Sequence, residues 1–108
     1  MKNILLIIFF LLSTIVKSQV VVLHFNAGWN ESNNVSWVED LSDCDLDFID
    51  IAKKPNLQKK YSIVVVPTLV VLQYDEEKKR YQADLSFKLA ATKEEVQEYI
   101  DELILSGF

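Results

Sequence analysis

Residues 20–29 read VVVLHFNAGW, an almost continuous apolar run that ends in a polar turn. The β-branched and apolar side chains of Val20–Phe25 predict a strand that is covered on both faces of a sheet. The next residues, Asn26–Asn34, include Gly28 and four asparagines, which is typical of a turn. We therefore expect a buried strand that ends abruptly in a polar segment.

Further strands follow from short apolar runs bounded by charged or turn-forming residues. They are predicted at Phe48–Ile51, Thr68–Tyr74 and Arg80–Phe87. The charged segment Asp75–Lys79 would join the last two strands as a hairpin. A strand, helix, strand unit favours a right-handed crossover between parallel strands, so the sheet should be mixed.

Three helices are predicted from apolar spacing and capping residues. They are expected at Val35–Leu41, from Pro55 to about Tyr61, and from the capping box of Thr92 and Glu95 towards Gly107. The predicted order is β-α-β-α-β-β-α. This order makes the fold class α/β, with a mixed four-stranded sheet flanked by helices.

Length, charge and residue counts exclude several classes of protein. The 108 residues suffice for one compact domain. A formal net charge of −5 argues against binding to nucleic acid. With one Cys and one His, neither a disulfide scaffold nor a Cys- or His-based metal site is expected, and no cofactor is predicted. Six acidic residues and no basic residue fall between Glu39 and Asp50, which predicts one negatively charged edge.

The N-terminal segment has the pattern of a secretory signal peptide. Lys2 precedes the short apolar stretch Ile4–Val16, and Val16 and Ser18 suit a signal peptidase that cuts before Gln19. We therefore divide the chain into a signal peptide, residues 1–18, and one domain, residues 19–108. The mature protein would be exported, to a periplasm or the extracellular space, without stable membrane insertion. An uncleaved anchor or a buried helix is the alternative.

Three strings of residues, together with the element order, resemble the thioredoxin superfamily. They are Leu23–Trp29, the segment from Asp50 through Pro55 to Ile63, and Val65–Leu69. The resemblance covers nearly all of residues 20–106, but the family's usual first strand and helix have no counterpart. It implies a minimal thioredoxin-like fold in which the bond between Val66 and Pro67 is cis.

The redox motif of that family does not carry over. Its Cys-x-x-Cys falls on Asn30-Glu31-Ser32-Asn33, so Asn30 and Asn33 occupy degenerate active-site positions. Disulfide exchange needs a thiolate and a second, resolving thiol, which carboxamides cannot supply. The sequence therefore argues against enzymatic activity and identifies no catalytic residue. We expect Asn30 to cap a helix instead.

His24 and Cys44 each have two interpretations. His24 falls where active relatives carry a buried acid. It is either a general base or, as we favour, a core His with one ring nitrogen hydrogen-bonded. Cys44 lies between Asp43 and Asp45, which should raise the pKa of its thiol and make the thiolate scarce. The alternative for Cys44 is an intermolecular disulfide.

The resemblance also implies a client-binding surface, which does not require the missing cysteines. The resemblance implies a groove bordered by Trp29, Val66 and Pro67, where an extended peptide could pair with the backbone at Val66. The predicted function is that of an exported, redox-inactive thioredoxin-like protein that binds a protein or peptide client. The alternative is a role in envelope thiol-disulfide homeostasis, through Cys44 or through cysteines of a partner.

Overall fold

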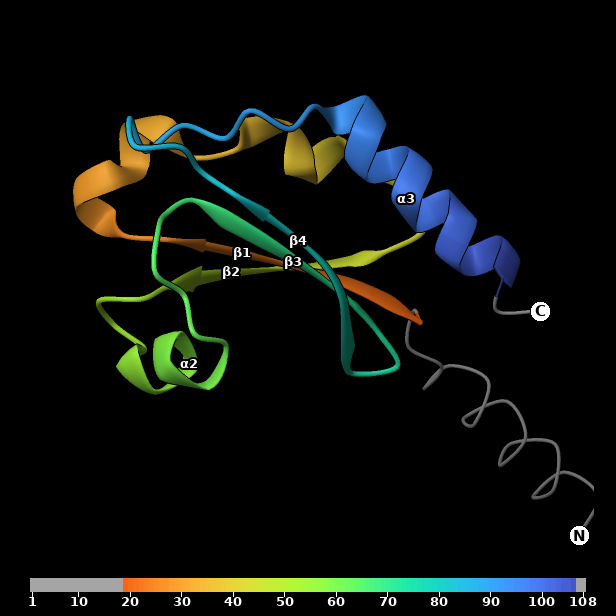
Figure 1. The fold of residues 1–108 in the computed structure, drawn as a ribbon, viewed down its shortest axis with the longest axis horizontal. Helices are drawn as coiled ribbons and strands as arrows, with labels where there is room; N and C mark the ends of the chain where they lie inside the picture. The colour runs from red at the N-terminus through yellow and green to blue at the C-terminus, as the bar shows by residue number, and fades with distance from the viewer. Residues whose placement is uncertain (1–18, 107–108) are drawn as a thin grey trace, which may run out of the picture.

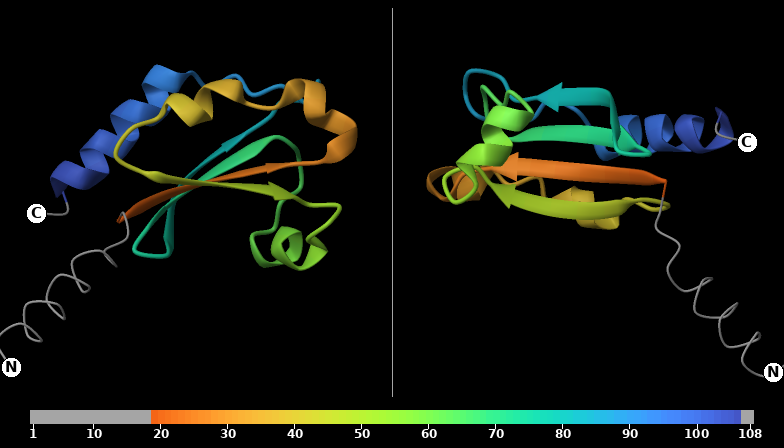
Figure 2. Two further views of the ribbon diagram at one scale, coloured as in Figure 1. Left: turned by 180° about the vertical axis from the view of Figure 1, so that it is seen from behind. Right: turned by 90° about the horizontal axis from the view of Figure 1, so that it is seen from below.

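A computed structural model describes residues 19–106 of the chain. Their strands form one mixed sheet in the order β2-β1-β3-β4 (Figures 1 and 2). The first strand is parallel to the second and antiparallel to the third, which in turn is antiparallel to the fourth. The strands are β1 (Val20–Asn26), β2 (Asp45–Asp50), β3 (Thr68–Gln73) and β4 (Glu76–Gln82).

Helical segments cover both faces of the sheet. One face carries η1, η2 and α3, and the other carries α2 (Figure 1). Their bounds are η1 (Gly28–Asn33), η2 (Ser36–Asp40), α2 (Pro55–Lys60) and α3 (Lys93–Ser106). This arrangement confirms the predicted fold class and element order. Within residues 19–106, no helix has the length and apolar character to cross a membrane.

Two apolar clusters lie on the two faces of the sheet, and β1 contributes to both. Val20 and Val22 pack into the cluster beneath α3 and η2, whereas Leu23 and Phe25 pack into the cluster beside α2. Side chains alternate between faces along a strand, so a strand that is buried on both faces needs apolar residues at nearly every position. Burial on both faces therefore explains the apolar run of β1.

Two predicted strands are wrong in their bounds: the strand predicted at Phe48–Ile51 is β2, which begins at Asp45, and the one predicted at Arg80–Phe87 is β4, which ends at Gln82. The chain reverses at Tyr74 and Asp75, which both have positive φ (51° and 65°), and β4 begins at the next residue. Two such residues form the tight hairpin turn that matches the twist of the flanking strands. Of the charged segment assigned to the connection, Glu76–Lys79 therefore belongs to β4, as an exposed edge allows.

The helix predicted at Val35–Leu41 is the 3₁₀ helix η2, flanked by Val35 and Leu41 and burying Val38. The capping box at the start of α3 is confirmed, because the Glu95 N–H donates to Thr92 Oγ1 (3.2 Å). The buried face of α3 consists of Val96, Ile100 and Leu103.

Candidate functional site

The candidate site lies where β1 ends and β3 begins. The Val66–Pro67 peptide bond, just before β3, is cis. Two hydrogen bonds fix this loop: Thr68 Oγ1 donates to Val65 O (2.7 Å) and the Ala83 N–H donates to Pro67 O (3.0 Å). The η1 segment follows β1 directly, so both halves of the site are anchored to adjacent strands.

Asparagine side chains connect η1 to β1 and to the cis-proline loop. Asn30 is buried, and its Nδ2 donates to Asn26 Oδ1 (3.1 Å) and to Val66 O (3.4 Å). Its Oδ1 accepts from Asn33 Nδ2 (2.8 Å). Asn26 Nδ2 donates in turn to the Asn30 carbonyl and to Asn34 Oδ1. A buried amide needs such partners, because an unpaired polar group away from water costs about 1–3 kcal/mol.

Asn30 therefore does not cap a helix. The η1 segment begins at Gly28, its N-cap is Ala27, and no side chain caps it. Asn30 lies inside η1, where φ of −113° and ψ of 21° break the helical geometry. Its side chain is directed to neighbouring side chains and loop carbonyls and leaves the orphan N–H groups of a helix start unbound.

The two degenerate positions lie within hydrogen-bonding distance of each other but carry amides. A 2.8 Å hydrogen bond joins Asn30 and Asn33, whereas two cysteines at these positions could form a disulfide. In the described residues the single thiol, that of Cys44, is free. The two asparagines therefore have a structural role: their hydrogen bonds link η1 to β1 and to the cis-proline loop.

Exposed apolar side chains surround this end of the sheet. Trp29 is 67% exposed, and its ring meets that of Phe87 edge-on at 5.3 Å. The segment that carries Phe87 joins β4 to α3 and runs beside η1 (Figures 1 and 2). Val64 and Leu85 are exposed in the connections that lead into β3 and out of β4. We call these four side chains the cis-proline rim: Trp29, Val64, Leu85 and Phe87.

Val66 and Pro67, the other residues predicted to border a groove, have buried side chains. Of the three predicted residues, Trp29 alone presents a large exposed face. The Val66 carbonyl accepts a hydrogen bond from Asn30, so this backbone acceptor already has an internal partner.

His24 lies in the middle of the sheet, 2% exposed. Its Nε2 accepts the Val35 N–H (3.1 Å), and its ring packs against Phe48 with centroids 4.9 Å apart. Burial lowers the pKa of His24, opposed in part by a backbone hydrogen bond. These contacts agree with a neutral core His. The ring also borders a pocket of about 320 Å³ whose polar lining includes Glu31, Asp50 and Lys53.

Cys44 lies at the other end of the sheet. It immediately precedes Asp45, which pairs with Val21 near the start of β1. About 17 Å of strand separate that pair from Asn26, where the candidate site begins. Burial raises the pKa of the Cys44 thiol to about 11, and Asp45 and Asp43 add to the effect. Cys44 is therefore not part of the candidate site around Trp29.

Several solved structures similar to this chain are thioredoxins. A mutant thioredoxin of Halobacterium salinarum is 20% identical, covers 79% of this chain and 74% of its own, and gives a TM-score of 0.63. Thioredoxin-2, described as a component of the malaria parasite's protein secretion machinery, is 21% identical over 81% of this chain and 85% of its own, with a TM-score of 0.66. The fold is that of thioredoxin.

A thioredoxin from Fasciola hepatica is also similar, at 20% identity and a TM-score of 0.56, over 80% of this chain and 82% of its own. Neither a family model nor a curated protein matches the sequence. At these identities the likeness establishes a thioredoxin-like fold, and the chemistry of this chain must be argued from its own residues.

Sequence reasoning missed parts of this candidate site. Phe87 was assigned to a strand, and its contact with Trp29 links residues that are far apart in the chain. The asparagine network had a signal, because Asn26, Asn30 and Asn34 recur every four residues. In an α-helix that spacing places residues on one face, although here Asn26 ends β1, Asn30 lies within η1 and Asn34 follows η1.

Proposed function

We propose that this chain is an exported, redox-inactive thioredoxin-like protein that binds a protein or peptide client at the cis-proline rim. One observation carries the proposal: Trp29, Val64, Leu85 and Phe87 are exposed at the same end of the sheet. Exposed apolar side chains that lie together, as the rings of Trp29 and Phe87 do, mark interaction surfaces, and Trp in particular concentrates binding energy.

The proposed binding is non-covalent. The side chains at the two degenerate positions are engaged in the asparagine network. Because the Val66 carbonyl accepts from Asn30, apolar contacts with Trp29 and Phe87 would supply more of the affinity than backbone pairing at Val66. A client segment with an exposed aromatic or aliphatic side chain fits this surface.

The test uses a photo-reactive amino acid at position 87, with position 105 as its matched control. Leu105 is also exposed, but it lies on α3, away from the rim. A specific adduct formed in the producing cells at position 87 and not at position 105 is the expected result. Equal adducts at both positions would contradict the proposal.

Affinity for the client identified in this way is then measured with single-residue variants. Trp29→Ala and Phe87→Ala should each weaken binding by about tenfold or more. Tyr74→Ala is the control, because Tyr74 is 70% exposed in the β3–β4 turn at the opposite end of the sheet. Unchanged affinity in both rim variants would reject the rim as the site.

Redox inactivity is tested separately with the reduction of a protein disulfide by dithiothreitol. The wild-type chain should not accelerate this reaction. An acceleration that disappears in Cys44→Ser would favour the thiol-disulfide alternative, independently of whether a client binds at the rim.

A further inference from the structure

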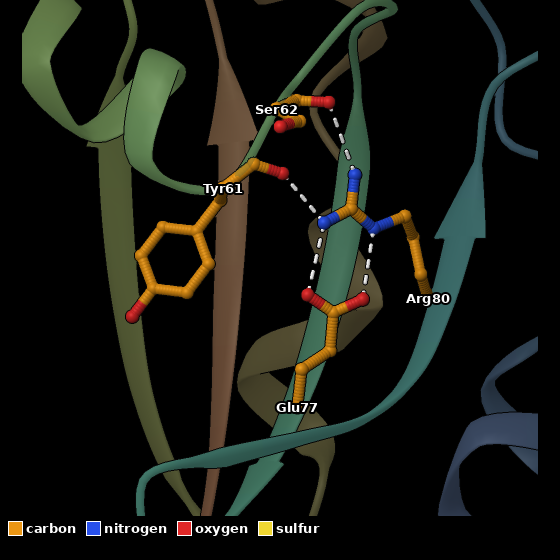
Figure 3. Close-up of polar contacts among 4 residues, drawn as sticks. All are labelled: Tyr61, Ser62, Glu77 and Arg80. Atoms are coloured by element: carbon orange, nitrogen blue, oxygen red, sulfur yellow. Dashed lines mark hydrogen bonds and ion pairs between the residues drawn. The ribbon is translucent and has the colours of Figure 1, made fainter.

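The two edges of the sheet differ in how they are protected. The β4 edge carries charges of both signs, its register shifts between Val71 and Leu72, and Arg80 forms an ion pair with Glu77 (Figure 3). Mixed charge, lysines and register irregularities discourage a further strand from pairing. We therefore expect no partner along β4.

The β2 edge has a different character. Among the described residues, β2 pairs with β1 alone (Figure 2). Asp45, Asp47 and Phe48 are exposed and Leu46 is half-buried, whereas every residue of β3 is buried. The unpaired side of an exposed strand offers backbone N–H and C=O groups to another chain.

From Asp45 to Phe48, acidic and apolar side chains alternate along β2. Asp45 and Asp47 lie opposite Val21 and Leu23 and so share the face that carries α2. Leu46 and Phe48 lie on the other face, where Leu46 packs with the α3 cluster and Phe48 contacts His24. From Asp45 to Phe48 the edge is therefore acidic on the face that carries α2 and apolar on the other, whereas Ile49 and Asp50 reverse this order.

We propose that the β2 edge binds an extended segment of a partner protein in which basic and apolar residues alternate. Added as a fifth strand, such a segment would place its Lys or Arg side chains beside Asp45 and Asp47, and its apolar side chains beside Leu46 and Phe48. Main-chain hydrogen bonds would supply affinity, and the lateral side-chain pairs would supply selectivity.

The acidic residues of β2 favour a basic partner segment over a second copy of this chain. Asp45, Asp47 and Asp50 lie in β2, Asp43 lies just before it, and no basic residue occurs between Glu39 and Asp50. Two β2 strands paired edge to edge would bring aspartates together, and like charges in lateral pairs are destabilising. The proposal does not depend on the cis-proline rim, which consists of other residues.

The test measures binding of labelled peptides to the full chain by fluorescence anisotropy at 0.15 M salt (about physiological ionic strength). The probe is a blocked peptide of alternating Lys and Val. Three matched peptides are its controls: alternating Glu and Val, the same Lys and Val residues in two blocks, and the alternating Lys peptide with N-methylated valines. N-methylation removes backbone donors and leaves the charge unchanged.

The chain offers a matched pair of charge-reversal variants. Asp45→Lys with Asp47→Lys reverses the proposed edge, and Glu98→Lys with Glu102→Lys makes the same change in net charge on exposed positions of α3. We expect the first variant to bind the alternating Lys peptide on the order of tenfold more weakly, and to gain affinity for the Glu peptide. The second should change both affinities by less than about twofold.

Several results would overturn the proposal. One is that the alternating Lys peptide does not bind the wild-type chain. Another is that the block or N-methylated peptide binds as tightly, which would mean attraction by charge without strand pairing. Equal weakening by both charge reversals would also place the interaction away from β2. Circular dichroism of each variant separates lost binding from lost folding.

Discussion

At the scale of single residues, His24 shows how an ionisable side chain is accommodated in a core strand. Its ring is enclosed by β2 and by the segment before η2, and its Nε2 accepts the Val35 N–H. This acceptor role requires the neutral ring. Protonation would remove the acceptor and place a charge away from water, and burial therefore lowers the pKa.

The free energy of unfolding should consequently depend on pH through His24. In the unfolded chain the ring titrates near 6.5, and in the folded protein its pKa is lower. Between these two values the unfolded chain binds the extra proton, so stability falls as pH decreases below about 6.5. Urea unfolding between pH 7.5 and 5 measures this slope, to which one His contributes at most about 1.4 kcal/mol per pH unit.

His24→Gln is the control for that measurement, since an amide oxygen can accept the Val35 N–H without titrating. The variant should lose part of the slope and keep its fold. A slope identical to that of the wild type would show that other groups cause the pH dependence.

Cys44 gives a second prediction at this scale. With a pKa of about 11, its thiol should react with iodoacetamide slowly at pH 7.5 and progressively faster up to pH 11, because the thiolate is the nucleophile. Mass spectrometry of the quenched reaction follows the rate, with free cysteine as the reference. A rate at pH 7.5 equal to that of free cysteine would contradict the assigned burial.

The sequence predicted the environment of individual residues correctly where neighbouring residues in the chain determine it. His24 as a core residue and the raised pKa of Cys44 are both confirmed. For Cys44, however, burial outweighs the neighbouring acids, which the sequence could not show. The helix-cap prediction for Asn30 was wrong because its partners include Val66, which is 36 residues away and comes close only through the fold.

At the scale of elements, Arg80 connects β4 to the segment between α2 and β3. Its guanidinium donates to the carbonyls of Tyr61 and Ser62 and pairs with both carboxylate oxygens of Glu77 (Figure 3). This segment leads directly into the cis-proline loop. The side chain therefore supports the candidate site from the opposite face of the sheet.

Arg80→Met should lower the free energy of unfolding by about 1–2 kcal/mol, because two carbonyls lose a charged donor. Glu77→Gln should cost less than about 1 kcal/mol, since the pair with Glu77 is partly exposed. Urea unfolding of both variants at pH 7 gives the comparison. Equal losses would assign the stabilisation to the ion pair and not to the carbonyl contacts.

Elements were predictable where burial leaves an apolar pattern. The strands β1 and β3, buried throughout or nearly so, were predicted within a residue of their bounds. The β4 edge has no such pattern, because its exposed strand tolerates Glu and Lys, so its start was missed. The 3₁₀ geometry of η1 and η2 was also missed, since apolar spacing does not distinguish short helical turns.

At the scale of the whole molecule, the sequence predicts a mature chain that begins at Gln19. Residues 1–18 lie outside the described part of the structure, and the expectation rests on their composition. The intact mass of protein recovered from its native compartment should equal that of residues 19–108. Ser18→Pro, which should block the peptidase, is the matched variant and should retain the N-terminal segment.

Recovery of wild-type protein that still carries Met1 would contradict cleavage. If that species is also found in the cytoplasm, export itself would be rejected.

The element order and the mixed four-stranded sheet were predictable, because a strand, helix, strand unit favours parallel strands and a hairpin adds antiparallel ones, but the strand order β2-β1-β3-β4 was not predicted. The cis-proline rim was not predictable either, since its members come from three separate connections: Trp29 after β1, Val64 before β3, and Leu85 and Phe87 after β4. Their location at one end of the sheet depends on the strand order and register, which no local pattern encodes.

The inner position of β1 also affects how the protein is made. Of the described strands, the first to leave a ribosome or a translocation channel is one that needs neighbours on both sides: Asp45–Asp50 on one and Thr68–Gln73 on the other. Until about residue 73 has emerged, the run VVVLHF has at most half of its backbone paired, and such exposed segments are prone to aggregation. Assembly of the core must therefore wait for the second half of the nascent chain, and a chaperone that holds residues 20–25 during that interval would act at the step most exposed to error.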